Sequence, residues 1–179
     1  LKPGAIITDV GSTKTSIHEE VLRLGMEHVF VGGHPMAGSE KTGYEHSTDH
    51  LLENAYYIIT PAEGSTSEQV ERVKQVAKLL GAIPMVLDYR EHDRAVAAVS
   101  HLPHLAASCL VNLVKEADGP DETMKRIAAG GFKDITRIAS SSPEMWEQIC
   151  MANCGPISDI LAQYIASLSQ VLQEIRNRQ

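Results

Sequence analysis

Short apolar runs alternate with helical patterns along the first half of the chain. Four runs have the composition of buried strands, at residues 5–10, 28–33, 56–60 and 83–88. The first is bounded by Gly4 and Gly11, and the third ends at Pro61. Apolar residues recur at helical spacing over residues 13–24 and over residues 67–80, where Ser65, Thr66 and Ser67 offer caps. Strands that alternate with helices of this length predict an α/β fold with a parallel sheet.

The pattern changes after Asp88, and no convincing strand follows. Residues 91–117 are alanine-rich and helix-prone, interrupted only at Pro103, and residues 156–178 form one long amphipathic pattern. Such broad apolar faces on a short helical region favour packing against a second copy of the chain. We therefore expect an α/β part over residues 1–88, followed by an all-α part over residues 89–179 that forms a homodimer.

Composition narrows the class of protein. The 179 residues are 43% hydrophobic, which is enough for one ordinary domain or two small ones. The formal net charge of −7, without a basic stretch, argues against a nucleic-acid surface. No apolar run approaches the roughly 18–20 residues that span a bilayer, and no signal peptide is visible, so we expect no membrane partner. The three cysteines match no common zinc spacing, which favours reduced thiols in a cytoplasmic protein.

Two stretches follow predicted strands, where open parallel sheets bind ligands. In "HVFVGGHPMAGSEKTG", Gly32 and Gly33 permit unusual backbone angles or a close ligand, and Pro35 stiffens the loop after His34. A histidine held there, with an ordinary pKa of about 6.5, can act as a general base, although a solvated loop histidine is the simpler interpretation. In "DVGSTK", the Ser12 hydroxyl can contact a ligand or merely cap the next helix; the glycines of a P-loop are missing.

The helical half offers cations. Lys133 and Arg137 are four residues apart, so on a helix they would share one face and suit an anion, or else form a solvated face paired with acidic neighbours. His101 and His104 flank Pro103, which could turn both rings toward a cleft. The pair His46 and His50 lacks the helix and glutamate of a zinc protease motif, so we expect no metal site.

Five stretches in this order resemble the prephenate dehydrogenase family over nearly the whole chain: "DVGSTK", "GGHPMAGSEKTG", "ENAYYIITP", "SHLPH" and "GFKDITRIASSSPEMW". The resemblance implies a partial Rossmann-type dinucleotide-binding domain over residues 1–88 and an all-α dimerisation and substrate-binding domain over residues 89–179. It also implies oxidative decarboxylation of prephenate, a dianion, to 4-hydroxyphenylpyruvate with NAD or NADP, in tyrosine biosynthesis.

The resemblance assigns roles to matching residues. His34 would be the catalytic base and Ser12 would align the ring hydroxyl with it. Arg137 would bind a substrate carboxylate, assisted by Lys133 and His104. Further substrate-binding, pocket or pocket-support positions would be Ser39, Glu40, His92, His101 and Trp146. The cofactor would contact Gly11, Ser12 and Pro35.

One family feature is missing from these residues. The Gly-x-Gly-x-x-Gly phosphate turn and the acidic residue that reads the ribose do not occur in a strand-to-helix setting. We therefore expect the chain to start about halfway through the dinucleotide-binding domain, to bind NAD(P)+ poorly and to be inactive by itself. An arogenate or dual-specificity dehydrogenase and a non-catalytic dimerisation or ligand-binding module remain alternatives.

Overall fold

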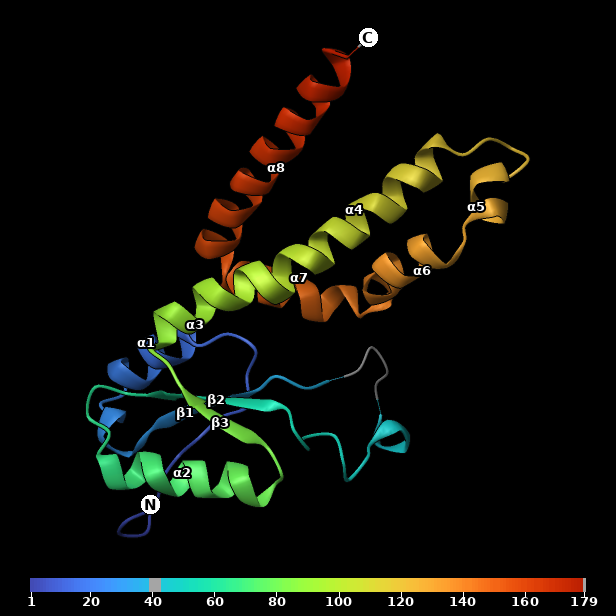
Figure 1. The fold of residues 1–179 in the computed structure, drawn as a ribbon. Helices are drawn as coiled ribbons and strands as arrows, with labels where there is room; N and C mark the ends of the chain where they lie inside the picture. The colour runs from blue at the N-terminus through green and yellow to red at the C-terminus, as the bar shows by residue number, and fades with distance from the viewer. Residues whose placement is uncertain (39–42, 179) are drawn as a thin grey trace. The chain divides into compact units, whose positions relative to one another are not determined.

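The computed structural model describes residues 1–38 and 43–178. The chain divides into two compact units, Leu1–Ala95 and Val96–Gln179. The first unit contains a sheet with flanking helices, whereas the described residues of the second are helical with connecting turns (Figure 1). The predicted class, α/β followed by all-α, is confirmed.

The sheet of the first unit has three strands in the order β1-β2-β3. Their bounds are Val31–Pro35 for β1, Tyr56–Pro61 for β2 and Ile83–Val86 for β3. The helices of this unit are α1 (Thr15–Arg23) and α2 (Ser67–Leu79), with short 3-10 turns η1 (Glu27–Val29) and η2 (Tyr44–His46). Helix α2 connects β2 to β3, which run parallel, as the strand–helix–strand pattern predicted.

The expectation that all strands run parallel is wrong for β1. This strand pairs antiparallel with β2, with Val31 opposite Pro61 and Pro35 opposite Tyr57. Parallel pairing needs a long crossover, usually a helix, and the described part of residues 36–55 contains only η2 and turns. The expected strand over residues 5–10 is also reduced to one parallel bridge, between Ile7 and Phe30.

The core of the first unit lies between the sheet and α2. Helix α2 covers one face of the sheet, and α1 lies on the side of the other face (Figure 1). The buried residues of this core are Val31, Tyr57, Ile59, Val73, Ala77 and Ala82. Each fully buried valine or isoleucine contributes about 1.5–3 kcal/mol. Helix α2 begins at a capping box, in which Thr66 and Gln69 each accept a hydrogen bond from the other's backbone N–H. The core therefore fixes the strand that carries His34.

A continuous helical segment begins at Tyr89 and ends at Ala117. It comprises α3 (Tyr89–Val96), a π-helical turn η3 (Ala97–His101) and α4 (Leu102–Ala117). The helix continues past Pro103, and the interruption takes the form of the π-helical turn directly before it, where an α-helix would need the N–H that proline lacks.

By length and composition this helical segment of 29 residues could cross a membrane. Its polar side chains argue against that use, because His92, Asp93 and His101 are buried and hydrogen-bonded to other parts of the protein. Such bonds are those of a core helix in a folded domain.

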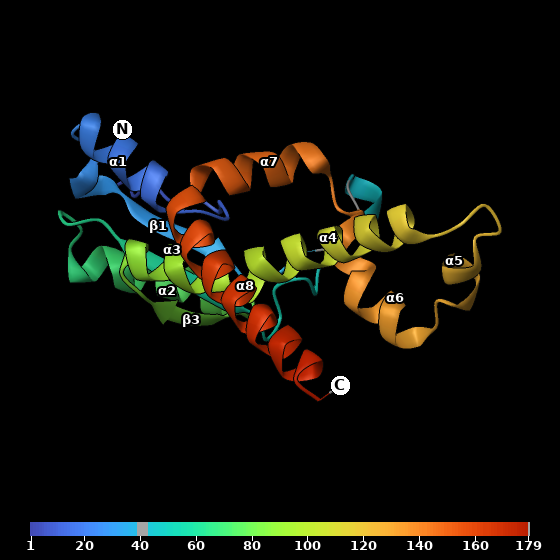
Figure 2. The same cartoon turned by 90° about the horizontal axis from the view of Figure 1, so that it is seen from above.

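The remaining helices are α5 (Thr123–Ile127), α6 (Gly130–Thr136), the 3-10 turn η4 (Arg137–Ser140), α7 (Pro143–Ala152) and α8 (Cys154–Arg176). Ser142 caps α7 by accepting the Met145 N–H. Within this unit α4 and α8 approach each other near their N-terminal ends and then diverge (Figures 1 and 2). A stripe of α8 consequently stays exposed, formed by Tyr164, Ile165, Leu168, Val171, Leu172 and Ile175.

Candidate active site

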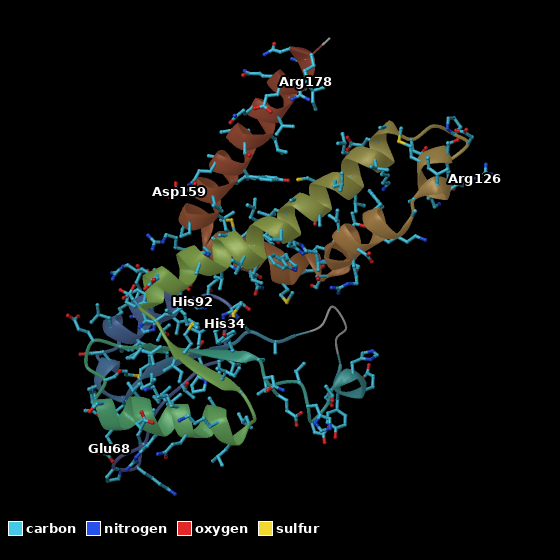
Figure 3. All side chains as sticks on the ribbon, viewed as in Figure 1. His34, Glu68, His92, Arg126, Asp159 and Arg178 are labelled. Carbon is cyan, nitrogen blue, oxygen red and sulfur yellow. The ribbon has the colours of Figure 1, made fainter. Side chains whose placement is uncertain are left out.

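His34 lies near the end of β1 and is half-buried. Its Nδ1 atom is 2.7 Å from Nε2 of His92, and the two rings meet edge-to-face. Both residues are labelled in Figure 3. A solvated loop histidine would have no such restraint. The position of the His34 ring is thus set by a second, buried imidazole.

His92 is in turn bonded to its neighbour Asp93, with 2.9 Å between His92 Nδ1 and Asp93 Oδ1. The Asp93 carboxylate also accepts the backbone N–H groups of Lys14 at 2.8 Å and Thr15 at 2.7 Å. Burial by itself would raise the pKa of Asp93, but the hydrogen bonds from His92, Thr15 and Lys14 outweigh it and hold the pKa below its ordinary value. Asp93 is therefore an ionised carboxylate at neutral pH.

The loop before α1 is attached to the residue that precedes His34. Lys14 is fully buried, forms an ion pair with Asp9 and donates to the Gly33 carbonyl at 2.8 Å. Asp9 accepts the N–H groups of Gly33 at 3.0 Å and Gly11 at 2.8 Å. Burial lowers the pKa of Lys14, although its hydrogen bond and attraction to Asp9 oppose that shift. This cluster fixes the backbone of Gly33, directly before the candidate base.

The predicted roles of the glycines in this loop need correction. Gly32 and Gly33 do not adopt positive φ, and the space beside them is filled by the protein rather than left for a ligand. A Cβ on Gly32 would lie 2.3 Å from Thr60 Oγ1, and one on Gly33 would lie 2.6 Å from the Asp9 carbonyl oxygen. Both glycines serve close internal packing.

Of the two alternatives for Ser12, the structure does not show the helix cap. The first N–H groups of α1 are bonded to Asp93 instead. The Ser12 side chain is half-buried and makes no hydrogen bond within residues 1–38 and 43–178. Its hydroxyl is thus available to a ligand.

In the second unit, the His104 and Trp146 rings stack. Burial lowers the pKa of His104, against a smaller opposing effect of a hydrogen bond from its ring to the Ile138 backbone. His104 Nδ1 and Trp146 Nε1 are buried and have no partner among the described atoms. His104 Nδ1 can therefore accept a hydrogen bond from a ligand, and Trp146 Nε1 can donate one to it. Nearby, His101 Nδ1 is 3.2 Å from Asn153 Nδ2, so His101 is bonded within the unit.

Lys133 and Arg137 do not share one continuous α-helix, as the spacing predicted. Lys133 lies in α6, which ends at Thr136, and Arg137 begins the 3-10 turn η4. Both residues are exposed, and Lys133 makes no ion pair with the part of the chain that the structure describes.

The structure brings His34 and His92 together in the first unit, where Gly11, Ser12 and Pro35 also lie. Lys133, Arg137 and His104 belong to the second unit. Ser39 and Glu40 lie outside the described residues. Among the described residues no three His, Cys, Asp or Glu side chains gather as a metal site would require, and His50 is bonded to Glu53 at 2.7 Å.

Two family models match this sequence. The one described as the prephenate dehydrogenase nucleotide-binding domain matches residues 1–86, and the one described as the prephenate dehydrogenase dimerization domain matches residues 88–179. The chain belongs to the prephenate dehydrogenase family.

Named relatives agree with this membership. Prephenate dehydrogenase of Bacillus subtilis (strain 168) is 41% identical over 167 residues, which are 93% of this chain and 45% of the relative. Prephenate dehydrogenase from A. aeolicus, solved in complex with hydroxyphenyl propionate and NAD+, has a TM-score of 0.91 at 34% identity and covers 99% of this chain and 62% of its own. Synechocystis arogenate dehydrogenase has a TM-score of 0.86 at 32% identity and covers 100% of this chain and 64% of its own. The chain spans about half the length of the curated relatives it matches.

The sequence did not indicate three residues that shape this site: Asp9, Lys14 and Asp93. Asp93 bonds backbone groups 78 and 79 positions away, so no local pattern indicates the contact. A lysine is also rarely buried, and nothing in "STK" distinguishes Lys14 from an exposed one. The one available signal was the adjacency of His92 and Asp93 in "EHD".

Proposed function

We propose that this chain carries the proton-accepting and carboxylate-binding residues of an NAD(P)+-dependent dehydrogenase that converts prephenate to 4-hydroxyphenylpyruvate and carbon dioxide. The observation that carries the proposal is the half-buried His34 ring, fixed at the end of β1 by its bond to His92. Membership of the prephenate dehydrogenase family and likeness to an enzyme solved with hydroxyphenyl propionate and NAD+ support it.

In this proposal His34 accepts the proton of the ring hydroxyl as the carbon that bears it loses a hydride. Ser12, whose hydroxyl has no partner within the described residues, holds the substrate hydroxyl in line with the imidazole. Loss of carbon dioxide leaves its bonding electron pair in the ring, which becomes aromatic. A positioned base of this kind contributes about 10²–10⁴-fold to the rate.

The cofactor would lie against the first unit. The available Ser12 hydroxyl, together with Gly11 and Pro35, fits a contact with the nicotinamide end. When bound, NAD(P)+ supplies the hydride acceptor. The choice between NAD and NADP depends on groups that read the ribose.

The dianionic substrate needs cations and donors for its two carboxylates. Arg137 is proposed to bind one carboxylate bidentately, with Lys133 adding a second positive charge. His104 and Trp146 offer the unpartnered ring atoms described above. Ser39 and Glu40, which lie outside the described residues, are proposed to contact the substrate.

The second unit is proposed to form a homodimer in the cytoplasm. The exposed apolar stripe of α8 is too extended for an isolated helix in water, and the family model for residues 88–179 is described as a dimerization domain. A second copy of the chain would cover this stripe.

An arogenate dehydrogenase, or an enzyme that accepts both substrates, is the closest alternative, favoured by the likeness to Synechocystis arogenate dehydrogenase. A non-catalytic module that keeps the fold is the alternative outside the enzyme class. Assaying the natural protein with prephenate and with arogenate, each with NAD+ and NADP+, distinguishes all three.

The matched variant is His34→Asn, which keeps polarity and removes the base. We expect its kcat to fall about 10²–10⁴-fold. Turnover within about tenfold of the wild type would contradict the role of His34, and no turnover of either substrate by the wild-type protein would favour the module.

A further inference from the structure

Both ring nitrogens of His92 are bonded inside the first unit. Nε2 lies 2.7 Å from His34 Nδ1, and Nδ1 lies 2.9 Å from Asp93 Oδ1. The His92 side chain is only 1% exposed. A hydrogen bond from His92 to a substrate would therefore require breaking one of these contacts, which differs from the pocket role that the family resemblance implied.

The chemistry of the three groups fixes where their protons lie. An ionised Asp93 carboxylate can only accept, so Nδ1 of His92 carries a proton. In the neutral His92 ring, Nε2 then has no proton and acts as an acceptor. The proton between the two rings consequently belongs to His34 Nδ1. A neutral His34 imidazole with its proton on Nδ1 has an unprotonated Nε2.

We propose that His92 and Asp93 are positioning residues that hold His34 in the tautomer whose Nε2 atom accepts the substrate proton. This inference rests on the proposed function, because it assigns how the base of that reaction is prepared. When His34 gains a proton on Nε2, it keeps donating through Nδ1 to His92. The Asp93 carboxylate behind His92 then stabilises the positive charge.

The surrounding charges fit this arrangement. On the α1 side, Lys14 and Thr15 donate their backbone N–H groups to Asp93, while the Lys14 ammonium group is held by Asp9 and the Gly33 carbonyl. Among the described residues, His18 interacts electrostatically with Lys14, Asp9, Asp93 and Asp88, and Tyr57 interacts with Asp9. Because the Lys14 charge is matched by Asp9, the carboxylate of Asp93 remains the counter-charge for the two imidazoles.

Kinetics of the complete enzyme test the inference through the variants His92→Leu and His92→Gln. His92→Leu removes the acceptor and should lower kcat about 10- to 100-fold, a part of the 10²–10⁴-fold that a base contributes. KM for prephenate should stay within about twofold, because His92 acts through His34 and not on the substrate. His92→Gln restores an acceptor oxygen and should recover at least a part of kcat. The matched control is His18→Gln, another buried histidine of the same unit, which should leave kcat within about twofold.

A nitrogen-15 NMR spectrum of histidine-labelled enzyme gives a readout that does not depend on turnover. The His34 signals, assigned by their loss in His34→Asn, should show a protonated Nδ1 and an unprotonated Nε2 near neutral pH. His92→Leu and Asp93→Asn should both shift the population toward the other tautomer. A wild-type His34 protonated on Nε2, or unchanged signals in both variants, would overturn the inference.

The results separate this inference from the proposed function. If His34→Asn remains active, the base assignment fails whatever the tautomer is. A second result is that His34→Asn is inactive, whereas His92→Leu keeps the wild-type kcat and the wild-type tautomer of His34. In that case the proposed function stands, and only the role of His92 and Asp93 is wrong. A raised KM with unchanged kcat in His92→Leu would instead place His92 on the substrate.

Discussion

The His104 imidazole lies flat against the Trp146 indole, with ring centroids 3.5 Å apart and an interplanar angle of 3°. The stack places a buried acceptor, His104 Nδ1, beside a buried donor, Trp146 Nε1, and neither has a partner among the described atoms. Leaving buried polar atoms unpaired costs about 1–3 kcal/mol each. A ligand that pairs with them recovers that free energy.

Replacing Trp146 by phenylalanine tests the donor. Trp146→Phe keeps an aromatic ring on His104 and removes Nε1, so KM for prephenate should rise about tenfold, the value of a hydrogen bond to a charged group. The free energy of unfolding of the free enzyme should not fall by more than about 1 kcal/mol, since no bond is lost there. Steady-state kinetics and urea unfolding measure the two quantities. An unchanged KM with a large loss of stability would show that Nε1 has only a structural role.

Arg137→Lys keeps the positive charge and removes the planar pair of donors. If Arg137 grips a carboxylate bidentately, KM for prephenate should rise about tenfold in this variant and about 100-fold in Arg137→Ala. Arg126→Lys, at an exposed arginine of α5, is the matched control and should leave KM unchanged. Equal KM values for Arg137→Lys and the wild type would remove the bidentate contact from the proposal.

Gly33→Ala should destabilise the first unit. The added Cβ would lie 2.6 Å from the Asp9 carbonyl oxygen and 2.9 Å from the Tyr57 ring, so the loop or the strand must shift. Overpacking of this kind costs about 1–3 kcal/mol. In Gly38→Ala the new Cβ meets no described atom within 4 Å, so its free energy of unfolding should change by less than about 0.5 kcal/mol. Urea denaturation distinguishes the two, and equal stabilities would contradict the packing role of Gly33.

Acidification should destabilise the folded protein partly through His18. Burial, and then the charge of Lys14, lower the pKa of His18, while Asp9, Asp88 and Asp93 oppose the shift. Below the ordinary histidine pKa of about 6.5 the unfolded chain binds a proton that the folded protein resists. The contribution of His18 to stability is therefore fully present above about pH 6.5 and is lost as the pH falls below it.

Urea midpoints measured between pH 7.5 and 5.5 check this prediction. The variant His18→Gln, which can keep a hydrogen bond to Thr60, should show a smaller loss of stability over the same interval. An identical pH dependence in the wild type and His18→Gln would contradict it.

Placing a charge on the exposed stripe of α8 should weaken the proposed homodimer. Leu168 is 50% exposed in the single chain, and Leu168→Glu would bury an unpaired carboxylate at the interface. Gln163→Glu adds the same charge on the opposite side of the helix and serves as the control. Sedimentation equilibrium should show monomers for the first variant and dimers for the second, and two dimeric variants would place the interface elsewhere.

Local patterns were sufficient to predict much of the fold. The strand at residues 56–60 and the helices at 67–80 and 156–178 agree with the structure to within about two residues, because periodicity and caps are local properties. The antiparallel pairing of β1 could not be predicted in this way. It depends on how the segment between β1 and β2 returns to the sheet, which strand periodicity does not specify.

The candidate site shows the same division between local and distant information. His34 could be selected from its neighbours in the sequence, but its bond to His92, 58 residues later, could not. The sequence suggested that Gly32 and Gly33 leave room for a ligand. In the structure Thr60 and Asp9 occupy that space, so no larger side chain would fit. A short stretch of sequence shows which backbone conformations its residues allow. It does not show which distant residues pack beside them.

The Asp93 carboxylate has two roles, and together they restrict which substitutions the protein can accept. One oxygen atom holds both His92 and the Lys14 N–H, and the other holds the Thr15 N–H. A substitution that altered the electrostatics behind His34 would at the same time loosen the start of α1. Selection for folding and selection for turnover therefore act on the same atoms at position 93. Directed evolution of the proton transfer at His34 should therefore accept few substitutions of Asp93. Substitutions of His92 are the better starting point.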